Sequence, residues 1–257
     1  MKRFLTALTA LLSALTLVPP VQAAERLLFI GNSYTGVNNL PNIYQEIVRS
    51  AGLPALDVKA STPGGKTLEQ HLSNAKSLAL IDEGNWDAVV LQGQSQEAAM
   101  SEHSESIRAS FLKGAKELCE RVLAKSPKAR IVFYQTWARH GDLWKGATTA
   151  DAVGENPDQM QAFNHKWYQE VATRNKAGVA PAGDAWQLNY HSPQVIRLHK
   201  KDNSHPEFNG SYLAALVLYA TLNPKASLQV PYHGQLSKSD AAYLQEIAHR
   251  VTHPVVK

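Results

Sequence analysis

Short apolar runs alternate with segments of helical periodicity along most of this chain. The apolar runs have the length and content of buried strands, and they cover residues 27–30, 56–60, 88–91, 131–134 and 179–182. A chain in which strands alternate with helices forms a parallel sheet whose two faces are covered by those helices. The pattern therefore predicts a single α/β domain with a central parallel sheet.

Capping residues indicate where two of the helices begin. Asn156 and Pro157 combine an N-cap with a first-turn proline, directly before a helical segment. Asn209 precedes the apolar segment GSYLAALVLYATL, which we expect it to cap, and we expect a last helix in SDAAYLQEIAHRV. The end of the chain is therefore predicted to be helical.

The first residues have the three regions of a secretory signal peptide. Lys2 and Arg3 precede a short apolar stretch at 4–18, and residues 21–23 form a small-residue cleavage site. An uncleaved anchor is the alternative, but the stretch is shorter than the roughly 20 apolar residues of a membrane span. We expect a signal peptide over 1–23 and one mature domain over 24–257, exported to the periplasm or secreted, without a stable membrane span.

Composition and charge argue against several other classes of protein. The formal net charge of +4 includes Lys2 and Arg3 and is spread without a basic run, so we expect no nucleic-acid binding. Cys119 is the only cysteine, so no internal disulfide forms, and its helical surroundings predict a packed thiol. The 10 histidines show neither H-E-x-x-H nor zinc spacing, so we expect no metal.

Three short segments, far apart in the sequence, carry side chains suited to acyl transfer. They are GNSYT at residues 31–35, QGQS at 92–95 and DNSHP at 202–206. Loops that follow parallel strands converge on one edge of a sheet, and Ser33 and Gln92 both come directly after predicted strands. We therefore expect these segments to meet at that edge.

An acid and a base stand three residues apart in the third segment. Asp202 is placed to orient His205, which can take the proton of Ser33. Each piece alone is weak, because a serine after a strand also caps helices and DNSHP also suits an ordinary turn. Together they predict a serine hydrolase. Asp184, in GDAW, is the alternative carboxylate, and Asp202 is preferred because its spacing to His205 is local.

The order Ser, Asp, His, together with GNS and DNSHP, resembles the SGNH (GDSL-like) hydrolase superfamily of esterases and lipases. The resemblance covers most of the chain, and HPEFNGSYLAA is similar to the family's lead into its last helix. It implies a three-layer α/β/α sandwich of flavodoxin-like type, with Ser33 as nucleophile, His205 as base, Asp202 as its orienting acid, and no cofactor. QGQS departs from the family's GxN block and resembles the QGES of carbohydrate acetylesterases.

The resemblance also implies an oxyanion hole. Its donors would be the backbone N–H of Ser33, the N–H of Gly64 or Gly65 in STPGGKT, and a side-chain amide, for which we expect Gln92. GGKT is similar to the end of a phosphate-binding loop as well, but Ala60 stands where that motif needs its first glycine.

A long polar loop at 138–156 follows the fourth predicted strand. Such loops are often lids or binding loops, and a surface insertion without a role is the other interpretation. We expect Tyr34, Trp137, Arg139 and Trp144 to contact substrate. The expected substrate is an O-acyl ester, in particular an O-acetyl ester of carbohydrate. A lipase or lysophospholipase of the same fold, and a non-catalytic carbohydrate-binding protein, remain alternatives.

Overall fold

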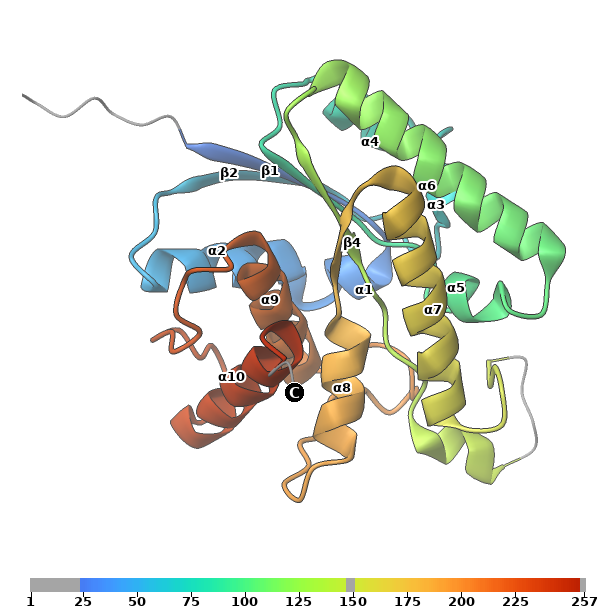
Figure 1. Cartoon of the computed structure of the whole chain (residues 1–257). Helices are drawn as coiled ribbons and strands as arrows, with labels where there is room; N and C mark the ends of the chain where they lie inside the picture. The colour runs from blue at the N-terminus through green and yellow to red at the C-terminus, as the bar shows by residue number, and fades with distance from the viewer. Residues whose placement is uncertain (1–23, 147–150, 255–257) are drawn as a thin grey trace, which may run out of the picture.

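The computed structural model describes residues 24–146 and 151–254, so the predicted signal peptide lies outside the described residues. Five parallel strands form the central sheet in the order β2-β1-β3-β4-β5 (Figure 1). The strands are β1 (Glu25–Ile30), β2 (Leu56–Ser61), β3 (Ala88–Leu91), β4 (Arg130–Tyr134) and β5 (Gly178–Ala180). The prediction of a parallel α/β sheet is confirmed.

The fifth strand is shorter than its apolar run. It ends at Ala180, and Pro181 is already the N-cap of the next helix. Proline has no N–H to donate to a strand ladder, and at this residue the chain turns into α8.

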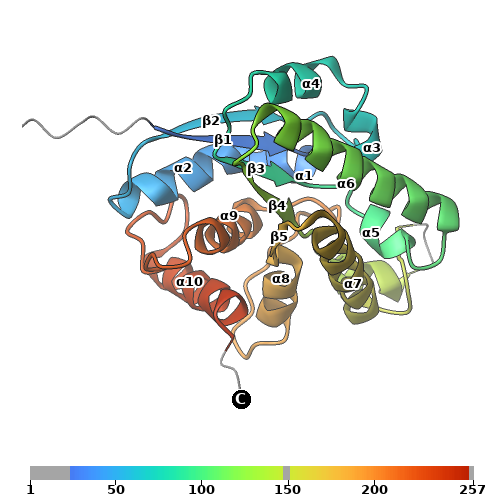
Figure 2. The ribbon, with the colours of Figure 1, turned by 45° about the horizontal axis from the view of Figure 1, so that its top comes forward.

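Helices connect the strands and cover both faces of the sheet, with α3, α4 and α6 above it and α2, α9 and α10 below it in Figure 2. The α-helices are α1 (Ser33–Gly36), α2 (Leu40–Ser50), α3 (Leu68–His71), α4 (Ala75–Asp82), α5 (Glu97–Met100), α6 (Glu105–Lys125), α7 (Pro157–Asn175), α8 (Ala182–Tyr190), α9 (Phe208–Leu222) and α10 (Lys238–Thr252). Two 3-10 segments are η1 (Val37–Asn39) and η2 (Gly141–Lys145).

Apolar side chains form two separate cores, one on each face of the sheet; β1, β3, β4 and β5 contribute to both, whereas the apolar residues of β2 belong to one. In β1, Leu27 and Phe29 pack with α2, α8, α9 and α10, whereas Leu28 and Ile30 pack with α6 and α7. Successive side chains of a strand point to opposite faces, so a wholly apolar strand is stable only between two helical layers. The three-layer arrangement is therefore present as expected.

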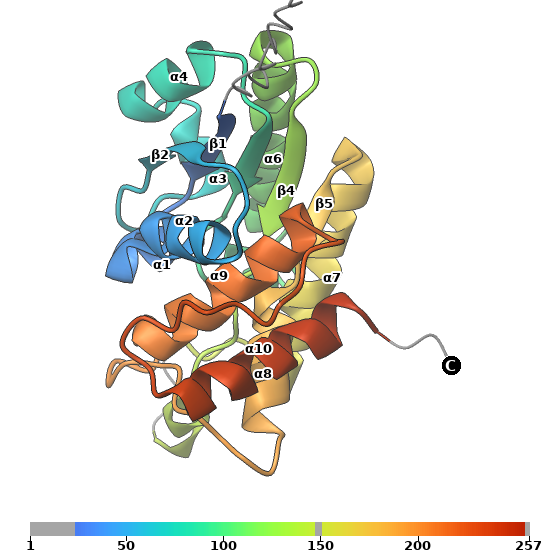
Figure 3. The ribbon, with the colours of Figure 1, turned by 90° about the vertical axis from the view of Figure 1, so that its left-hand side faces the viewer.

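Helix α9 is apolar on almost every side because it lies between the sheet and other helices. It packs against α2, α8 and α10, and Figure 3 shows α9 and α10 side by side. The prediction that Asn209 caps this helix is wrong, because the N-cap is Glu207, two residues earlier, and the Asn209 amide donates to the Arg197 carbonyl at 3.3 Å. Asn156 does cap α7, accepting the N–H of Gln159 at 2.9 Å.

Cys119 is buried in α6, where burial raises the pKa of its thiol to about 12. In the described part of the chain, no helix combines the length and apolar character needed to cross a bilayer.

Candidate active site

The turn after β1 places Ser33 at the carboxyl edge of the sheet. Asn32 is the N-cap of α1, and its Oδ1 accepts the N–H of Tyr34 at 3.0 Å. A side chain at Gly31 would stand 2.5 Å from Thr35 Oγ1, so only glycine lets the chain turn this closely. Ser33 is thus the first residue of a short helix, with its side chain at the surface of the turn.

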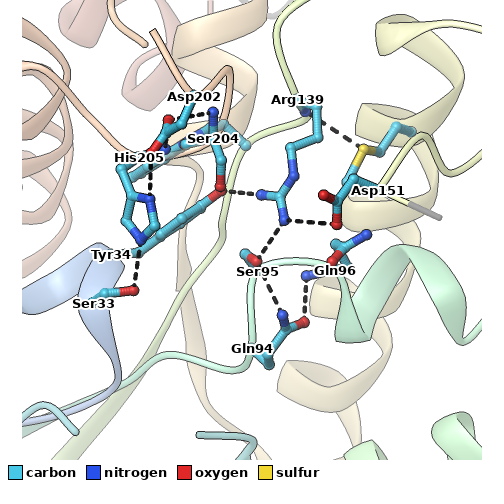
Figure 4. A network of polar contacts seen from close by, with 12 residues as sticks. Ser33, Tyr34, Gln94, Ser95, Gln96, Arg139, Asp151, Asp202, Ser204 and His205 are labelled. Atoms are coloured by element: carbon cyan, nitrogen blue, oxygen red, sulfur yellow. Dashed lines mark hydrogen bonds and ion pairs between the residues drawn. The ribbon is translucent and has the colours of Figure 1, made fainter. Parts of the chain in front are cut away.

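Ser33, His205 and Asp202 form a continuous hydrogen-bonded chain (Figure 4). Ser33 Oγ lies 3.0 Å from His205 Nε2, and His205 Nδ1 lies 2.8 Å from Asp202 Oδ2. The other carboxylate oxygen, Asp202 Oδ1, accepts the backbone N–H groups of Ser204 and His205, both at 2.9 Å. The three residues predicted to act together therefore lie in hydrogen-bonding contact.

Electrostatics favours an ionised Asp202. Partial burial alone would raise its pKa, but hydrogen bonds from the Ser204 and His205 backbone and from the imidazole outweigh it and lower the pKa below its ordinary value. A carboxylate at Nδ1 holds the imidazole proton there, which leaves Nε2 as an acceptor for the Ser33 hydroxyl.

Asp184, the alternative acid, belongs to a different cluster. Its Oδ1 accepts the side-chain amides of Gln135 and Gln161 at 3.1 and 2.9 Å, and its Oδ2 lies 2.8 Å from Nδ1 of His165. These contacts fasten α8 to α7 and to the segment after β4.

Gln92 does not match the oxyanion role expected for it. It is fully buried, and its Oε1 accepts the Asn32 N–H at 3.0 Å and the Thr35 hydroxyl at 2.8 Å. Its amide nitrogen donates to Asn32 Oδ1 at 3.0 Å and to the Gly93 carbonyl. The amide is therefore occupied in supporting the turn at residues 31–35, called the nucleophile turn below because Ser33 is the predicted nucleophile, and this corrects the expectation.

Gln94, two residues further on, has its amide among the site residues in Figure 4. It is half-buried, its Nε2 lies 3.2 Å from Ser95 Oγ, and its Oε1 accepts the N–H of Gln96 at 2.7 Å. One of its two amide protons serves the Ser95 contact, so Gln94 is the better candidate for a side-chain donor at this edge.

The glycine loop after β2 lies against the nucleophile turn. The Asn32 amide donates to the Lys66 carbonyl at 3.1 Å, which fastens the two loops together. Gly65 has φ of +70°, a left-handed conformation that favours glycine, and a Cβ on Gly64 or Gly65 would meet nothing within 4 Å. Both positions stay candidates for a backbone donor.

The aromatic residues expected to contact substrate are covered. Tyr34 stacks on Trp137 with ring centroids 4.4 Å apart, and Trp137 stacks on Trp186 at 3.8 Å. All three are about 1% exposed, so Tyr34 and Trp137, which were expected to contact substrate, are covered by other parts of the protein instead. Burial also raises the pKa of Tyr34, which keeps its hydroxyl protonated.

Arg139 and Trp144, both in the segment after β4, also make internal contacts. Arg139 is 6% exposed and donates to the Tyr34 hydroxyl and, at 3.1 Å, to Ser95 Oγ. Trp144 donates from its indole to the Gly154 carbonyl at 3.0 Å and packs beside Met160. None of these contacts supports the interpretation of this segment as a substrate-binding loop. Residues 147–150 lie outside the described residues.

Glu97 is a site residue that the sequence analysis missed. Its Oε2 accepts the N–H of Gln94 at 3.1 Å and that of Leu68 at 3.4 Å, and so joins the loop after β3 to the loop after β2. Burial raises the pKa of Glu97 to about 7. The signal was the three-residue spacing from Gln94, which is the spacing at which a carboxylate reaches back to a helix start.

Two cavities of about 240 Å³ lie near this edge of the sheet. One is lined by residues 137–142, the α8 side chains and His199. The other lies beside Gln94 and is lined by Thr67, Met100 and Ile107 among others. In the described residues, no group of three or more His, Cys, Asp or Glu side chains is arranged to hold a metal ion.

Comparisons with known proteins show the fold. No protein-family model matches the chain, and a comparison with curated protein sequences finds no match. The structure is similar to a DUF4886 family protein from Bacteroides uniformis (TM-score 0.73, 18% identity, 90% of this chain and 96% of that one). It is also similar to a lipase/acylhydrolase from Enterococcus faecalis (TM-score 0.59, 15% identity, 82% and 100% of the two chains). An acetylxylan esterase from Geobacillus stearothermophilus is a third (TM-score 0.52, 12% identity, 77% and 92%). The chain therefore has the α/β fold of these lipase/acylhydrolase and acetylxylan esterase structures, as its resemblance to SGNH hydrolases predicted.

Proposed function

We propose that this protein is a serine esterase that hydrolyses O-acyl esters. The observation that carries the proposal is the hydrogen-bonded chain from Ser33 Oγ to His205 Nε2, at 3.0 Å, and from His205 Nδ1 to Asp202, at 2.8 Å. A nucleophile, a base and a group that orients the base are the three parts that acyl transfer by serine requires.

In the proposed mechanism, Ser33 attacks the ester carbonyl while His205 takes its proton at Nε2. Asp202 stabilises the imidazolium that forms, and His205 then protonates the leaving alcohol. The acyl group on Ser33 is hydrolysed by water, which His205 activates in the same way. The developing oxyanion is met by the N–H of Ser33, the N–H of Gly64 or Gly65, and the amide of Gln94 in place of Gln92.

The acyl and alcohol parts of the substrate are proposed from weaker support. We favour O-acetyl esters of carbohydrate, because the QGQS segment resembles that of carbohydrate acetylesterases and an acetylxylan esterase shares the fold. The cavity beside Gln94, with Met100 and Ile107 in its wall, is the place where a longer acyl chain would bind. A lipase with the same mechanism would use that cavity.

The experiment uses the purified chain over 24–257 and a panel of p-nitrophenyl esters from acetate to palmitate, beside acetylated xylan and peptidoglycan. We expect turnover of the short esters and labelling of Ser33 by a fluorophosphonate. Ser33→Ala should abolish both, whereas Ser239→Ala, an exposed serine of α10, should retain both. Labelling at another serine, with Ser33→Ala still active, would refute the assignment of Ser33 as the nucleophile. A preference for palmitate would favour a lipase, and neither labelling nor turnover would favour a binding protein.

We also propose export of the chain with loss of residues 1–23, supported by the charged, apolar and small-residue regions of that segment. Amino-terminal sequencing of the exported form should start near Ala24. An intact Met1 in a membrane fraction would contradict this.

A further inference from the structure

One buried network touches a sequence neighbour of each part of the proposed machinery. Tyr34 follows the nucleophile, Ser204 precedes the base, and Ser95 follows the proposed oxyanion donor. The Tyr34 hydroxyl lies 2.9 Å from Ser204 Oγ. Arg139 donates from Nη1 to the Tyr34 hydroxyl and from Nη2 to Ser95 Oγ at 3.1 Å, as Figure 4 shows.

Arg139 bonds directly to both the nucleophile turn, at Tyr34, and the loop after β3, at Ser95. Its guanidinium presents donors in a rigid fork, so one side chain reaches hydroxyls on two loops at fixed angles. A lysine ammonium, which is a single point on a flexible stem, cannot reproduce that geometry.

Arg139 is also buried at a cost. The side chain is 6% exposed. Its Nη2 lies 3.9 Å from Oδ1 of Asp151, a carboxylate that is 60% exposed, so this ion pair is long and open to solvent. A buried cation whose compensation comes mainly from hydroxyl groups loses more hydration than it regains. A neutral side chain would fill the position with a smaller loss of hydration. The guanidinium is therefore better explained by the Tyr34 and Ser95 hydroxyls that it holds in place than by a contribution to the stability of the fold.

The Tyr34 ring transmits this restraint to the base. It stacks on Trp137 with an angle of 3° between the planes, and the Trp137 indole donates to the Ser204 carbonyl at 3.0 Å. Ser204 is therefore held at its hydroxyl by Tyr34 and at its carbonyl by Trp137. His205, the next residue, takes its position from that anchor.

We propose that Arg139 is a positioning residue that sets the three loops in register, so that Ser33, His205 and Gln94 meet the same ester group. This inference rests on the proposed esterase function. Arg139 touches no reacting atom, and its effect passes through the Tyr34 and Ser95 hydroxyls. Misplacement of a catalytic group by about 1 Å can cost about 10²-fold in rate, which sets the scale of the expected effect.

The test compares Arg139→Gln, Arg139→Lys and Tyr34→Phe with Arg174→Gln, an exposed arginine of α7 that pairs with Glu170. We expect the first three to lower kcat by about 10- to 100-fold with KM changed by less than about threefold. Arg174→Gln should leave both unchanged. The double variant Arg139→Gln/Tyr34→Phe should lose less than the product of the single losses, because both act through one contact.

Two measurements separate this inference from the esterase proposal and from a merely structural role. One is the rate at which a fluorophosphonate labels Ser33, and the other is the low-field proton NMR signal of His205 Nδ1–H. Arg139→Gln and Tyr34→Phe should slow the labelling and shift or broaden the signal at a temperature where circular dichroism shows both folded.

If the wild type labels but turns over no ester, the esterase proposal fails and these measurements still decide the role of Arg139. Unchanged labelling and an unchanged signal in Arg139→Gln overturn the inference. If Arg139→Gln does not fold, Tyr34→Phe and Ser95→Ala, which each remove one contact, decide it by the same two readouts.

Discussion

At the scale of single residues, the burial and the side-chain direction of a glutamine decide whether it supports the backbone or lies open at the edge of this site. Gln92 continues the strand ladder, since its N–H donates to the Ile30 carbonyl at 2.9 Å, and its side chain points into the protein beneath Asn32. Gln94 comes after the chain has turned at Gly93 and stays half-buried at the edge. Two identical side chains therefore have separate surroundings: Gln92 supports the nucleophile turn, and Gln94 is the side chain proposed to meet the substrate.

This difference predicts opposite effects for two alanine substitutions. Gln92→Ala leaves the Asn32 N–H and the Thr35 hydroxyl without their acceptor, and each buried unpaired group costs about 1–3 kcal/mol of unfolding free energy. Gln94→Ala should change that free energy by less than about 0.5 kcal/mol, yet lower kcat by about 10²- to 10³-fold. Urea unfolding and steady-state kinetics on both variants check this. A stable Gln92→Ala beside a fully active Gln94→Ala would contradict both assignments.

At the scale of elements, the loop that carries Asp202 and His205 is held by the contact of α9 with α8. Gly210, in the first turn of α9, meets Trp186 of α8 closely, and a Cβ there would stand 2.4 Å from Trp186 Cζ2 and 2.7 Å from the Leu198 carbonyl oxygen. Trp186 in turn stacks under Trp137. The approach of the two helices thus reaches the base of the site.

Gly210→Ala therefore tests whether steric clash or helix propensity determines the stability of the protein at this position. Alanine is the better helix former by about 1 kcal/mol, so propensity alone predicts stabilisation. Because one of the atoms in the way is a backbone oxygen, we expect a loss of about 1–3 kcal/mol instead. Thermal unfolding checks this, with Asn209→Ala as the matched control one residue earlier. A Gly210→Ala protein that melts above the wild type would show that α8 and α9 can move apart freely.

At the scale of the whole molecule, buried titratable groups give stability two opposing dependences on pH. Burial raises the pKa of Glu97 to about 7, so its contribution is complete below the unfolded pKa and is lost as pH rises through about 7. Burial lowers the pKa of His71 to about 4 and that of His199 to about 3. Their contribution is complete above the unfolded pKa and is lost as pH falls through the folded values.

Glu97→Gln isolates the first dependence, because the histidine contributions are the same in both proteins and cancel. The unfolding free energy of the wild type relative to this variant should fall by about 2 kcal/mol between about pH 5 and about pH 8. Urea unfolding across that range measures it. A difference that is constant with pH would mean that Glu97 titrates normally in the folded protein.

The sequence by itself determined the strands, the alternation that makes the sheet parallel, and the three residues of the proposed triad. These features are local or repetitive. Apolar runs mark strands because both faces of the sheet are covered, and Asp202 reaches His205 within one turn of chain. Ser33 was found because it directly follows β1, at an edge where all parallel strands end.

Only the tertiary structure decided which polar and aromatic side chains lie at the edge of the candidate site and which face the interior. Tyr34, Trp137 and Arg139 were predicted to contact substrate, and the fold buries all three against one another. Gln92 was predicted as an oxyanion donor, and the fold turns its amide to Asn32, 60 residues away in sequence. Such outcomes depend on which loops meet at the sheet edge and on the direction of each side chain there. The alternation of strands and helices predicts that these loops meet at one edge, but the pattern of residue types contains no information on the direction of each side chain there, because the contacts that settle it form only when distant segments pack.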